Sequence, residues 1–404
     1  MTDSILIGGA GHGAGQVIAT LKQHKFAGKI ILVGDEPHLP YQRPPLSKKY
    51  LAGDLPAERL HFKPASFYEH PQIEIHLGER IVSIDRDTHH ATTAAGVEIP
   101  YDKMVLALGS RVRKVDVPGC DLPGVHYLRN IADVDAIRAD MTNSKRVVIV
   151  GAGYIGLEVA AVCRQYGLDV TVVEMADRVM SRVVSPNVSD FYQLEHTNRG
   201  VKLLLSTGLA AFEGKRRVKA VLTDDEQSIP ADFVVVGVGI QANTELAEAA
   251  GLDVDNGIVV DDQCQTSDTD IYAIGDCTSH PNDIYGQRLR LESVHNALEQ
   301  AKTAASNLCG IETHYTQVPW FWSDQYDLKL QIAGLSQGHD QVILRGDPAS
   351  RSFACLYLRG GLLIAVDAIN SPRDFMQSKA LIAKHTIVDP DQLAKSDLAL
   401  KDLA

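Results

Sequence analysis

Cysteine is scarce in this 404-residue sequence and does not cluster. The six cysteines contain no Cys-x-x-Cys pair and no metal-ligand spacing: Cys120, Cys163, Cys264, Cys277, Cys309 and Cys355. This spacing excludes a cysteine-held metal site or iron–sulfur cluster, and an electron relay through a vicinal dithiol. Cys163 lies in an apolar, helix-like stretch, where we expect it to pack in the core. Cys277 follows Gly275-Asp276, and we expect no redox role for it.

Long hydrophobic runs and an excess of positive charge are also absent. No apolar run approaches the roughly 18 to 20 residues that a membrane helix needs. The N-terminus enters a strand at once, which leaves no room for a cleavable signal peptide. A formal net charge of −12 argues against nucleic acid, whose phosphates would be repelled. We therefore expect a soluble cytoplasmic protein of two or three domains.

Two glycine-rich segments dominate what the sequence does contain. Residues 5–14 read ILIGGAGHGA and residues 147–156 read VVIVGAGYIG. In such fingerprints the first glycine makes a tight strand-to-helix turn, the second lets a pyrophosphate approach the backbone, and the third small residue packs helix on strand. The candidate binding residues are Gly9, Gly11, Gly13 and Ala14 in the first segment, and Gly151, Gly153, Ile155 and Gly156 in the second. A chain with two such sites is expected to pass electrons between two dinucleotides.

An acidic residue closes the second strand of each unit. Glu174 lies 23 residues after Gly151, where a carboxylate accepts hydrogen bonds from both ribose hydroxyls of NAD and repels the 2′-phosphate of NADP. This favours NADH, although a solvated acid at a strand end would look the same and Arg178 lies close by. In the first unit Asp35 and Glu36 occupy the matching place, and we favour Asp35 as the ribose ligand.

The two units resemble each other beyond their fingerprints. The aliphatic run at residues 104–109 is mirrored by the run at residues 231–239, and we count Gly239 at its end with the nucleotide site. From about residue 319 the pattern changes to alternating strands, closed by a helix near residues 374–384. We predict an α/β fold with two Rossmann-like domains and a small α+β C-terminal domain. The expected boundaries are 1–112 with 242–318 for the FAD-binding domain, 113–241 for the NAD-binding domain and 319–404 for the C-terminal domain.

The run at residues 266–276 reads as a strand that ends in Gly275-Asp276. Taken alone it would fit an ordinary strand-to-turn aspartate. Together with two fingerprints it resembles the second flavin motif of two-dinucleotide flavoproteins, in which the aspartate binds the ribityl chain. This resemblance assigns FAD to the first fingerprint.

Four further runs make the resemblance specific: YQRPPLSK at 41–48, GYIGLEVA at 153–160, ESVHNALEQ at 292–300 and PWFWSDQ at 319–325. The chain resembles the FAD-dependent ferredoxin reductases of bacterial oxygenase systems, the putidaredoxin and rubredoxin reductase family. The tryptophan-containing run, with Tyr326 after it, is most similar to reductases that feed cytochrome P450 systems. A glutathione-reductase-like fold is implied.

The resemblance also implies particular contacts. FAD would be held at Gly13, Asp35, Lys48, Arg129, Asp276 and Val294, with Ile81 at the adenine. Lys48 would place a positive charge near flavin N5 and N1, and Arg129 would pair with the pyrophosphate. Glu158 would orient the nicotinamide carboxamide. Without the resemblance, each of these three would equally suit a surface side chain.

Trp320 and Trp322 would lie near the flavin edge, and we count Trp320 with Lys48 and Glu158 as catalytic and Trp322 as cofactor-binding. We expect that they do not both face the same way on a strand, so that one of them lines the site or the partner surface. Two departures from the family pattern stand out. Leu108 replaces the threonine of an Ala-Thr-Gly run, and His295 stands where relatives often have proline or glutamine.

The expected reaction follows from these assignments. NADH passes a hydride to FAD, and the flavin releases single electrons to a [2Fe–2S] ferredoxin. Because ferredoxins are typically acidic and this chain is too, docking would need a local basic patch, for which Arg43, Lys49, Arg288 and Arg290 are candidates. The alternatives are a rubredoxin reductase, an oxidase, and a non-turnover NADH sensor similar to apoptosis-inducing factor. We expect no metal site.

Overall fold

The computed structural model describes residues 3–403, which form two compact units. Within these residues, unit 1 comprises 3–43, Ala57–Arg111 and Gln241–Pro319, and unit 2 comprises Pro44–Pro56, Val112–Ile240 and 320–403. Among residues 3–403, no helix is both long enough and apolar enough to span a membrane.

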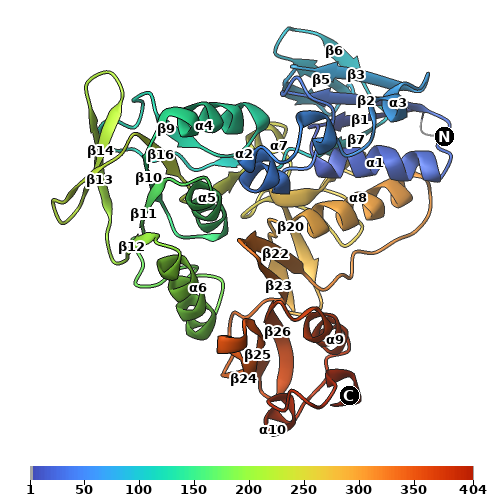
Figure 1. Ribbon diagram of the computed structural model, residues 1–404. Coiled ribbons are helices and arrows are strands. Elements are labelled where there is room, and N and C mark those ends of the chain that lie inside the picture. The colour runs from blue at the N-terminus through green and yellow to red at the C-terminus, as the bar shows by residue number, and fades with distance from the viewer. Residues whose placement is uncertain (1–2, 404) are drawn as a thin grey trace. The chain divides into compact units, whose positions relative to one another are not determined.

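Unit 1 is built on a five-stranded parallel sheet in the order β19-β7-β1-β2-β3. The strands are β1 (Ser4–Gly8), β2 (Lys29–Gly34), β3 (Ile73–Leu77), β7 (Lys103–Leu106) and β19 (Ile271–Ala273). The aliphatic runs of β1, β2, β7 and β19 are buried on both faces, as is typical of parallel sheets, whereas the edge strand β3 is only partly buried. Helices α1 (His12–Gln23) and α8 (Val294–Leu308) lie side by side in the core on one face (Figure 1).

The other face of this sheet carries a second core that includes side chains of an antiparallel sheet. That sheet contains β4 (Ile81–Asp85), β5 (His90–Thr93) and β6 (Glu98–Pro100). The smaller elements are η2 (Ala57–Leu60), α3 (Ala65–Tyr68), β8 (Ser110–Val112), β17 (Ile240–Ala242), α7 (Glu245–Ala249), β18 (Ile258–Val259), η3 (Gly275–Cys277), β20 (Thr278–Asn282) and β21 (Gln287–Leu289).

Unit 2 contains a parallel sheet of the same design, in the order β12-β11-β10-β16-β9. Its strands are β9 (Val125–Tyr127), β10 (Arg146–Val150), β11 (Asp169–Val173), β12 (Lys202–Leu204) and β16 (Phe233–Val236). The accompanying elements are α4 (Ile131–Asn143), α5 (Tyr154–Gln165), α6 (Pro186–Asn198), β13 (Leu209–Gly214), β14 (Val218–Thr223) and β15 (Ser228–Pro230).

The two parallel sheets repeat each other strand by strand. β1 lies between β2 and β7 as β10 lies between β11 and β16. The first fingerprint glycine of each unit donates its N–H to the end of the neighbouring strand, Gly9 to Val33 O at 2.7 Å and Gly151 to Val173 O at 2.8 Å. The predicted pair of Rossmann-like units, with matching runs at 104–109 and 231–239, is confirmed.

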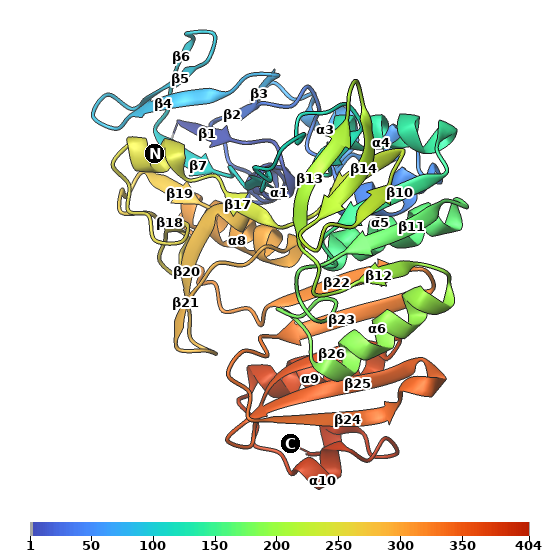
Figure 2. The same cartoon turned by 90° about the vertical axis from the view of Figure 1, so that its left-hand side faces the viewer.

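The C-terminal part of unit 2 is a five-stranded antiparallel sheet in the order β22-β23-β26-β25-β24 (Figure 2). The strands are β22 (Trp320–Gln325), β23 (Leu328–Gly334), β24 (Gln341–Asp347), β25 (Ser352–Arg359) and β26 (Leu362–Ile369), and α9 (Pro372–Ala383) packs on β23 and β26. The short elements of the unit are η1 (Pro44–Ser47), α2 (Lys49–Ala52), η4 (Pro348–Ser350), α10 (Pro390–Leu393) and η5 (Leu400–Leu403). The predicted α+β C-terminal domain is thereby confirmed.

A buried arginine fixes the end of the chain to this sheet. Arg345 is 3% exposed and pairs with Asp374 at 3.0 Å. Its guanidinium also donates to the carbonyl oxygens of Leu393, Lys395 and Leu398. The last turns of the chain are therefore held by hydrogen bonds to one side chain.

Candidate active site

The turn of the first fingerprint admits only glycine at its first position. Gly9 has φ +107°, and a Cβ there would lie 2.3 Å from the carbonyl oxygen of Ala107. Gly11 is the N-cap of α1 without a side-chain cap, and a Cβ on it would have no atom within 4 Å. A Cβ on Gly13 would lie 2.9 Å from Ile274 Cδ1, so α1 packs closely on the end of β19. The open, uncapped helix N-terminus fits the pyrophosphate of a dinucleotide.

The second fingerprint is built in the same way. Gly151 has φ +104° and its Cβ would lie 2.4 Å from Gly237 O, whereas Gly153 caps α5 and faces open space. A Cβ on Gly156 would lie 2.1 Å from Gly151 O. Ile155 is exposed on the first turn of α5, and Gly239, with φ +111°, is exposed near the end of β16. This unit therefore holds a second cradle of the same shape.

The acids beyond β2 differ in their surroundings. Glu36 accepts hydrogen bonds from the Tyr41 hydroxyl at 2.7 Å and from Arg43 at 2.5 Å. Asp35 is exposed. Only Asp35 therefore presents its carboxylate to solvent at the strand end. Ile81, by contrast, is 7% exposed and packs in the core of unit 1.

Asp276 begins the turn after β19 within a polar frame. Ser110 donates its hydroxyl to the Asp276 carboxylate at 2.8 Å. The side-chain oxygen of Gln300 accepts from Gly275 N at 2.7 Å and from the Thr278 hydroxyl at 3.0 Å. Sequence reasoning missed Ser110 and Gln300. The signal for Ser110 was its place directly after the Ala-Leu-Gly run, which lacks the threonine hydroxyl of relatives.

Val294 and Arg129 both lie at helix starts. Val294 is the first residue of α8, whose N-cap Ser293 accepts from Asn296 N at 3.1 Å. Arg129, in unit 2, comes just before α4, and its backbone N–H donates to the Asp133 carboxylate at 2.8 Å. The Arg129 side chain is half-buried.

Hydrogen bonds hold the side chains of Glu174 and Arg178, which follow the end of β11. Glu174 accepts from Ala152 N at 2.6 Å and from Ala176 N at 2.9 Å, so its carboxylate is held against the fingerprint turn. The Arg178 guanidinium donates to Val184 O at 2.9 Å, and its other contacts are Ser189 Oγ at 2.6 Å and Ser181 O at 2.7 Å. The Arg178 guanidinium is therefore held by its own loop and by α6.

Glu158 is the centre of a buried cluster of polar and charged side chains. It is 1% exposed on α5 and accepts from Lys48 Nζ at 2.8 Å, Ser47 Oγ at 2.5 Å and Ser323 Oγ at 2.6 Å. Burial raises the pKa of Glu158 above its usual value, while Lys48 and then the two hydroxyls oppose that rise. Lys48 and Glu158, which the sequence placed 110 residues apart without a stated contact, form a buried ion pair. Ser47 and Ser323 were not predicted.

The two tryptophans correct a prediction. Trp320 and Trp322 lie on the same side of β22, with ring centroids 5.5 Å apart, while the ring of Phe321 between them packs against Tyr154 in a tilted arrangement at 4.9 Å. The expectation that they cannot face the same way was wrong, because alternate residues of a strand share a face. Both rings are partly exposed and form one aromatic surface, which Lys379 approaches at 5.7 Å from the Trp320 ring.

The four candidate docking cations have unequal surroundings. In unit 1, Arg43 pairs with Glu36 and Arg290 with Glu292 at 2.6 Å. Arg288 donates to the carbonyl oxygens of Val260 and Ser279. Lys49, in unit 2, is exposed at the start of α2.

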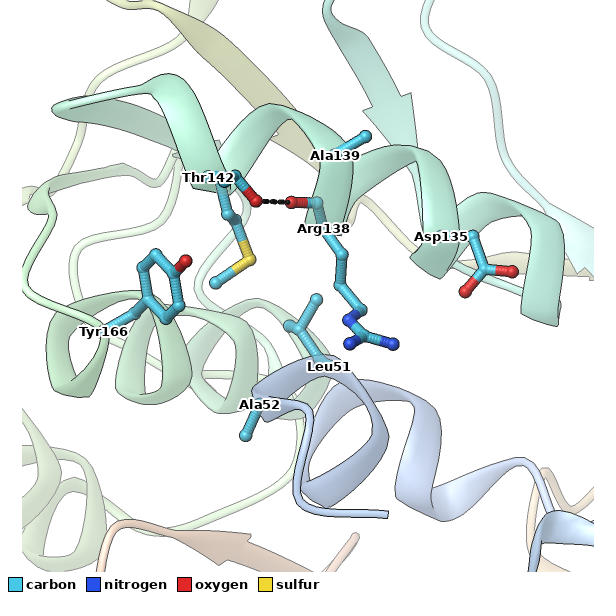
Figure 3. Close-up of a pocket in the computed structure, with 8 residues that line it drawn as sticks. Leu51, Ala52, Asp135, Arg138, Ala139, Thr142 and Tyr166 are labelled. Atoms are coloured by element: carbon cyan, nitrogen blue, oxygen red, sulfur yellow. Dashed lines mark hydrogen bonds between the residues drawn. The ribbon is translucent and has the colours of Figure 1, made fainter. Parts of the chain in front are cut away.

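A hollow of about 290 Å³ lies between α2 and α4 (Figure 3). It is lined by Leu51, Ala52, Asp135, Arg138, Ala139, Met141, Thr142 and Tyr166. The Arg138 guanidinium lies 5.5 Å from the centre of the Tyr50 ring, and the Tyr50 hydroxyl donates to Asp135 at 2.8 Å. None of the predicted site residues lines it.

Comparison with known proteins identifies the family. Residues 3–301 match the pyridine nucleotide-disulphide oxidoreductase family, and residues 320–404 match the reductase C-terminal family. The chain belongs to this oxidoreductase family. It is 44% identical to rhodocoxin reductase of Rhodococcus erythropolis over 98% of this chain and 93% of the relative.

Two solved structures extend the likeness over the full length. The ferredoxin reductase for the CYP199A2 system of Rhodopseudomonas palustris is 43% identical, with a TM-score of 0.96 over 100% of both chains. The covalent putidaredoxin reductase–putidaredoxin complex is 40% identical, with a TM-score of 0.96 over 99% of this chain and 98% of that one.

Proposed function

We propose that this oxidoreductase is an NADH-dependent ferredoxin reductase that holds FAD at the first fingerprint and NADH at the second. The observation that carries the proposal is the pair of matching cradles, each with an open helix N-terminus and a first glycine that no other residue can replace. FAD, when bound, supplies the step from a two-electron donor to one-electron release. The cysteine spacing leaves no cluster-binding motif in this chain, so the iron–sulfur cluster belongs to the partner.

Each predicted FAD residue has a task in this proposal. The N-terminus of α1 at Gly11 receives the pyrophosphate, Asp35 binds the adenosine ribose and Asp276 binds the ribityl chain. Lys48 supplies positive charge to the reduced flavin, and Arg129 supports the pyrophosphate. Val294 and Ile81 complete the set at the flavin and adenine ends. Residues 113–241 form the NAD-binding domain, and 319–404 the C-terminal domain.

Selectivity for NADH follows from two side chains at the end of β11. The Glu174 carboxylate, held by Ala152 N, repels a 2′-phosphate. Arg178, the nearby cation, is tied to two carbonyl oxygens of its own loop and to the Ser189 hydroxyl of α6, so it is not available to bind that phosphate. Glu174→Gln removes the repulsion, and we expect the ratio of kcat/KM for NADPH to that for NADH to rise about tenfold.

The control for this selectivity test is Asp177→Asn, which neutralises an exposed acid three residues further on and should leave the ratio unchanged. Equal use of NADH and NADPH by the unaltered enzyme would contradict the assignment of Glu174.

Docking of the acidic ferredoxin is proposed at the predicted basic patch, with Lys49 and Arg290 as its testable members. Arg288 supports main-chain carbonyls, so reversing its charge would disturb the β20–β21 region as well as any partner. Lys49→Glu and Arg290→Glu should raise KM for ferredoxin in a salt-dependent manner and leave KM for NADH unchanged. An unchanged KM for ferredoxin in both variants would contradict the proposed docking role of this basic patch.

Turnover separates the reductase from an NADH sensor. NADH is added without oxygen until the flavin absorbance bleaches, and an oxidised iron–sulfur ferredoxin is then supplied. Rapid recovery of the flavin absorbance, with reduction of the ferredoxin, is expected for the reductase. A long-lived charge-transfer band without recovery would identify the sensor instead.

A further inference from the structure

A line of buried polar side chains leads away from Glu158 inside unit 2. Ser323 Oγ lies 2.6 Å from Glu158 Oε1, and Gln325 Nε2 lies 3.2 Å from Ser323 Oγ. Gln325 Oε1 lies 2.9 Å from His196 Nε2, and the Tyr326 hydroxyl lies 3.2 Å from His196 Nδ1. Ser323, Gln325 and His196 are completely buried.

The direction of every hydrogen bond in this line follows from the charge on Glu158. An ionised carboxylate only accepts, so Ser323 must give its single proton to Glu158. Ser323 can then only accept from the Gln325 amide, which turns the Gln325 oxygen toward His196. The imidazole must therefore carry its proton on Nε2 and accept from Tyr326 at Nδ1.

We propose that Ser323, Gln325, His196 and Tyr326 form a polarised hydrogen-bond chain that keeps the buried Glu158 carboxylate ionised and in position beside Lys48. The chain rests on the proposed role of Glu158 toward the nicotinamide, and its members are positioning residues for that reaction. Each donor points toward Glu158, so each polarises the next and strengthens the bond that reaches the carboxylate.

The backbone conformation of Tyr326, at the outer end of the hydrogen-bond chain, is a second observation that supports the proposal. Tyr326 has φ +58° in the β22–β23 turn, where a bulky residue is rare and glycine is the usual occupant. This backbone conformation places the hydroxyl at His196, while the ring receives the Arg199 guanidinium at 4.3 Å. Tyr326 therefore reaches His196 from a backbone conformation that a tyrosine rarely adopts.

The chain does not carry protons between the surface and the active site. A proton could pass Gln325 only if its amide became an imidic acid, which is a poor relay. His196 is also a poor proton acceptor, because burial lowers its pKa to about 4 and keeps the ring neutral at physiological pH. Stabilising a fixed charge is the task that this set of groups can perform.

Charged and titratable groups also flank both ends of this line of side chains, among them Arg164 of α5 near Tyr326. Lys48 lies at the inner end, and Tyr192 of α6, whose raised pKa reflects burial first, is also influenced by Glu158. At the outer end Arg199 and Glu195 form an ion pair on α6. The Tyr326 side also includes Asp327 and Arg351, which pair at 2.6 Å, and Asp324 lies half-buried on β22.

The test is the pH profile of flavin reduction by NADH, followed by stopped-flow absorbance of the FAD-loaded enzyme. His196→Leu and Gln325→Leu interrupt the chain, so the acidic limb of the rate should move to higher pH by about one pH unit, a tenfold change in the ionisation of Glu158. His196→Gln still offers a donor and an acceptor and should restore most of the unaltered profile. His280→Phe is the matched control, because His280 is an equally buried histidine outside the chain.

Tyr326→Phe gives a milder interruption that removes only a hydroxyl, and it serves if the core variants fail to bind FAD. Tyr326→Phe should move the acidic limb of the pH profile of flavin reduction to higher pH, by less than the other two variants do. An unmoved limb in Gln325→Leu and Tyr326→Phe would overturn the chain, as would equal losses in His196→Gln and His196→Leu.

Glu158→Gln separates this inference from the proposed function. If Glu158→Gln slows flavin reduction while the chain variants leave the limb in place, only the chain fails. If Glu158→Gln reduces flavin as fast as the unaltered enzyme, the role of Glu158 toward the nicotinamide fails, and the chain fails with it.

Discussion

The two glycines of the second fingerprint offer a matched pair of substitutions with opposite expected results. Alanine at Gly153 adds a Cβ with no atom within 4 Å and keeps an ordinary φ of −77°. The folded protein meets no clash, and the stiffer unfolded chain contributes about 0.4–1 kcal/mol, but alanine is a poorer N-cap than glycine and offsets that gain. The free energy of unfolding should therefore change by less than about 1 kcal/mol. The added methyl group occupies the side from which a pyrophosphate approaches, so KM for NADH should rise by about 10- to 100-fold, or about 1.4–2.8 kcal/mol.

Alanine at Gly151 should instead destabilise the folded protein. Its Cβ would lie 2.4 Å from Gly237 O at φ +104°, so the backbone must move. The left-handed conformation alone costs about 1–2 kcal/mol, and the clash adds to it. We expect a lower free energy of unfolding for Gly151→Ala by at least about 2 kcal/mol.

The assay combines urea unfolding, followed by tryptophan fluorescence, with steady-state kinetics for NADH. FAD content should stay unchanged in Gly153→Ala, because the proposed FAD site uses the other fingerprint. Loss of FAD with unchanged KM for NADH would refute the assignment of the two cradles. Equal destabilisation by both substitutions would refute the reasoning from the geometry of the turn.

Two further predictions concern stability. Burial raises the pKa of Asp367 to about 7, above its value in the unfolded chain, so the folded state retains a proton that the unfolded state has lost. Its contribution to stability is therefore full below about pH 4 and is lost as the pH rises through 7, by up to about 4 kcal/mol; Asp367→Asn should flatten that part of the pH profile of unfolding, and an unchanged slope would contradict the protonation. Arg345→Met should lower the free energy of unfolding by about 2–3 kcal/mol, because it leaves the half-buried Asp374 without its charged partner and three carbonyl oxygens without their donor. It should also speed proteolytic cleavage after residue 390, and an unchanged cleavage rate would argue against the anchor.

The dinucleotide folds were predictable from the sequence because their signals are local. A strand, a Gly-x-Gly turn and a helix lie within about 20 residues, and the steric reason for Gly9 and Gly151 acts through the neighbouring strand. The C-terminal strands were likewise visible in their alternation. The mistaken orientation of Trp320 and Trp322 came from the rule for neighbours i and i+1, applied to a pair that is two residues apart.

The missed residues share a different physical reason. Ser323 meets Glu158 across 165 residues of sequence, and His196 meets Gln325 across 129. A lone serine or histidine carries no periodic signal that would predict such a contact. The fate of Arg178 was hidden for a related reason, since its partners are mainly carbonyl oxygens, which every residue possesses.

The number of ferredoxins reduced per NADH tests the central claim most directly. The FAD-loaded enzyme is mixed, without oxygen, with a limiting amount of NADH and an excess of oxidised [2Fe–2S] ferredoxin, and the ferredoxin absorbance is followed to completion. The account predicts two ferredoxins reduced for each NADH consumed. Consumption of NADH without reduced ferredoxin, or a purified protein that stays colourless when offered FAD, would contradict it.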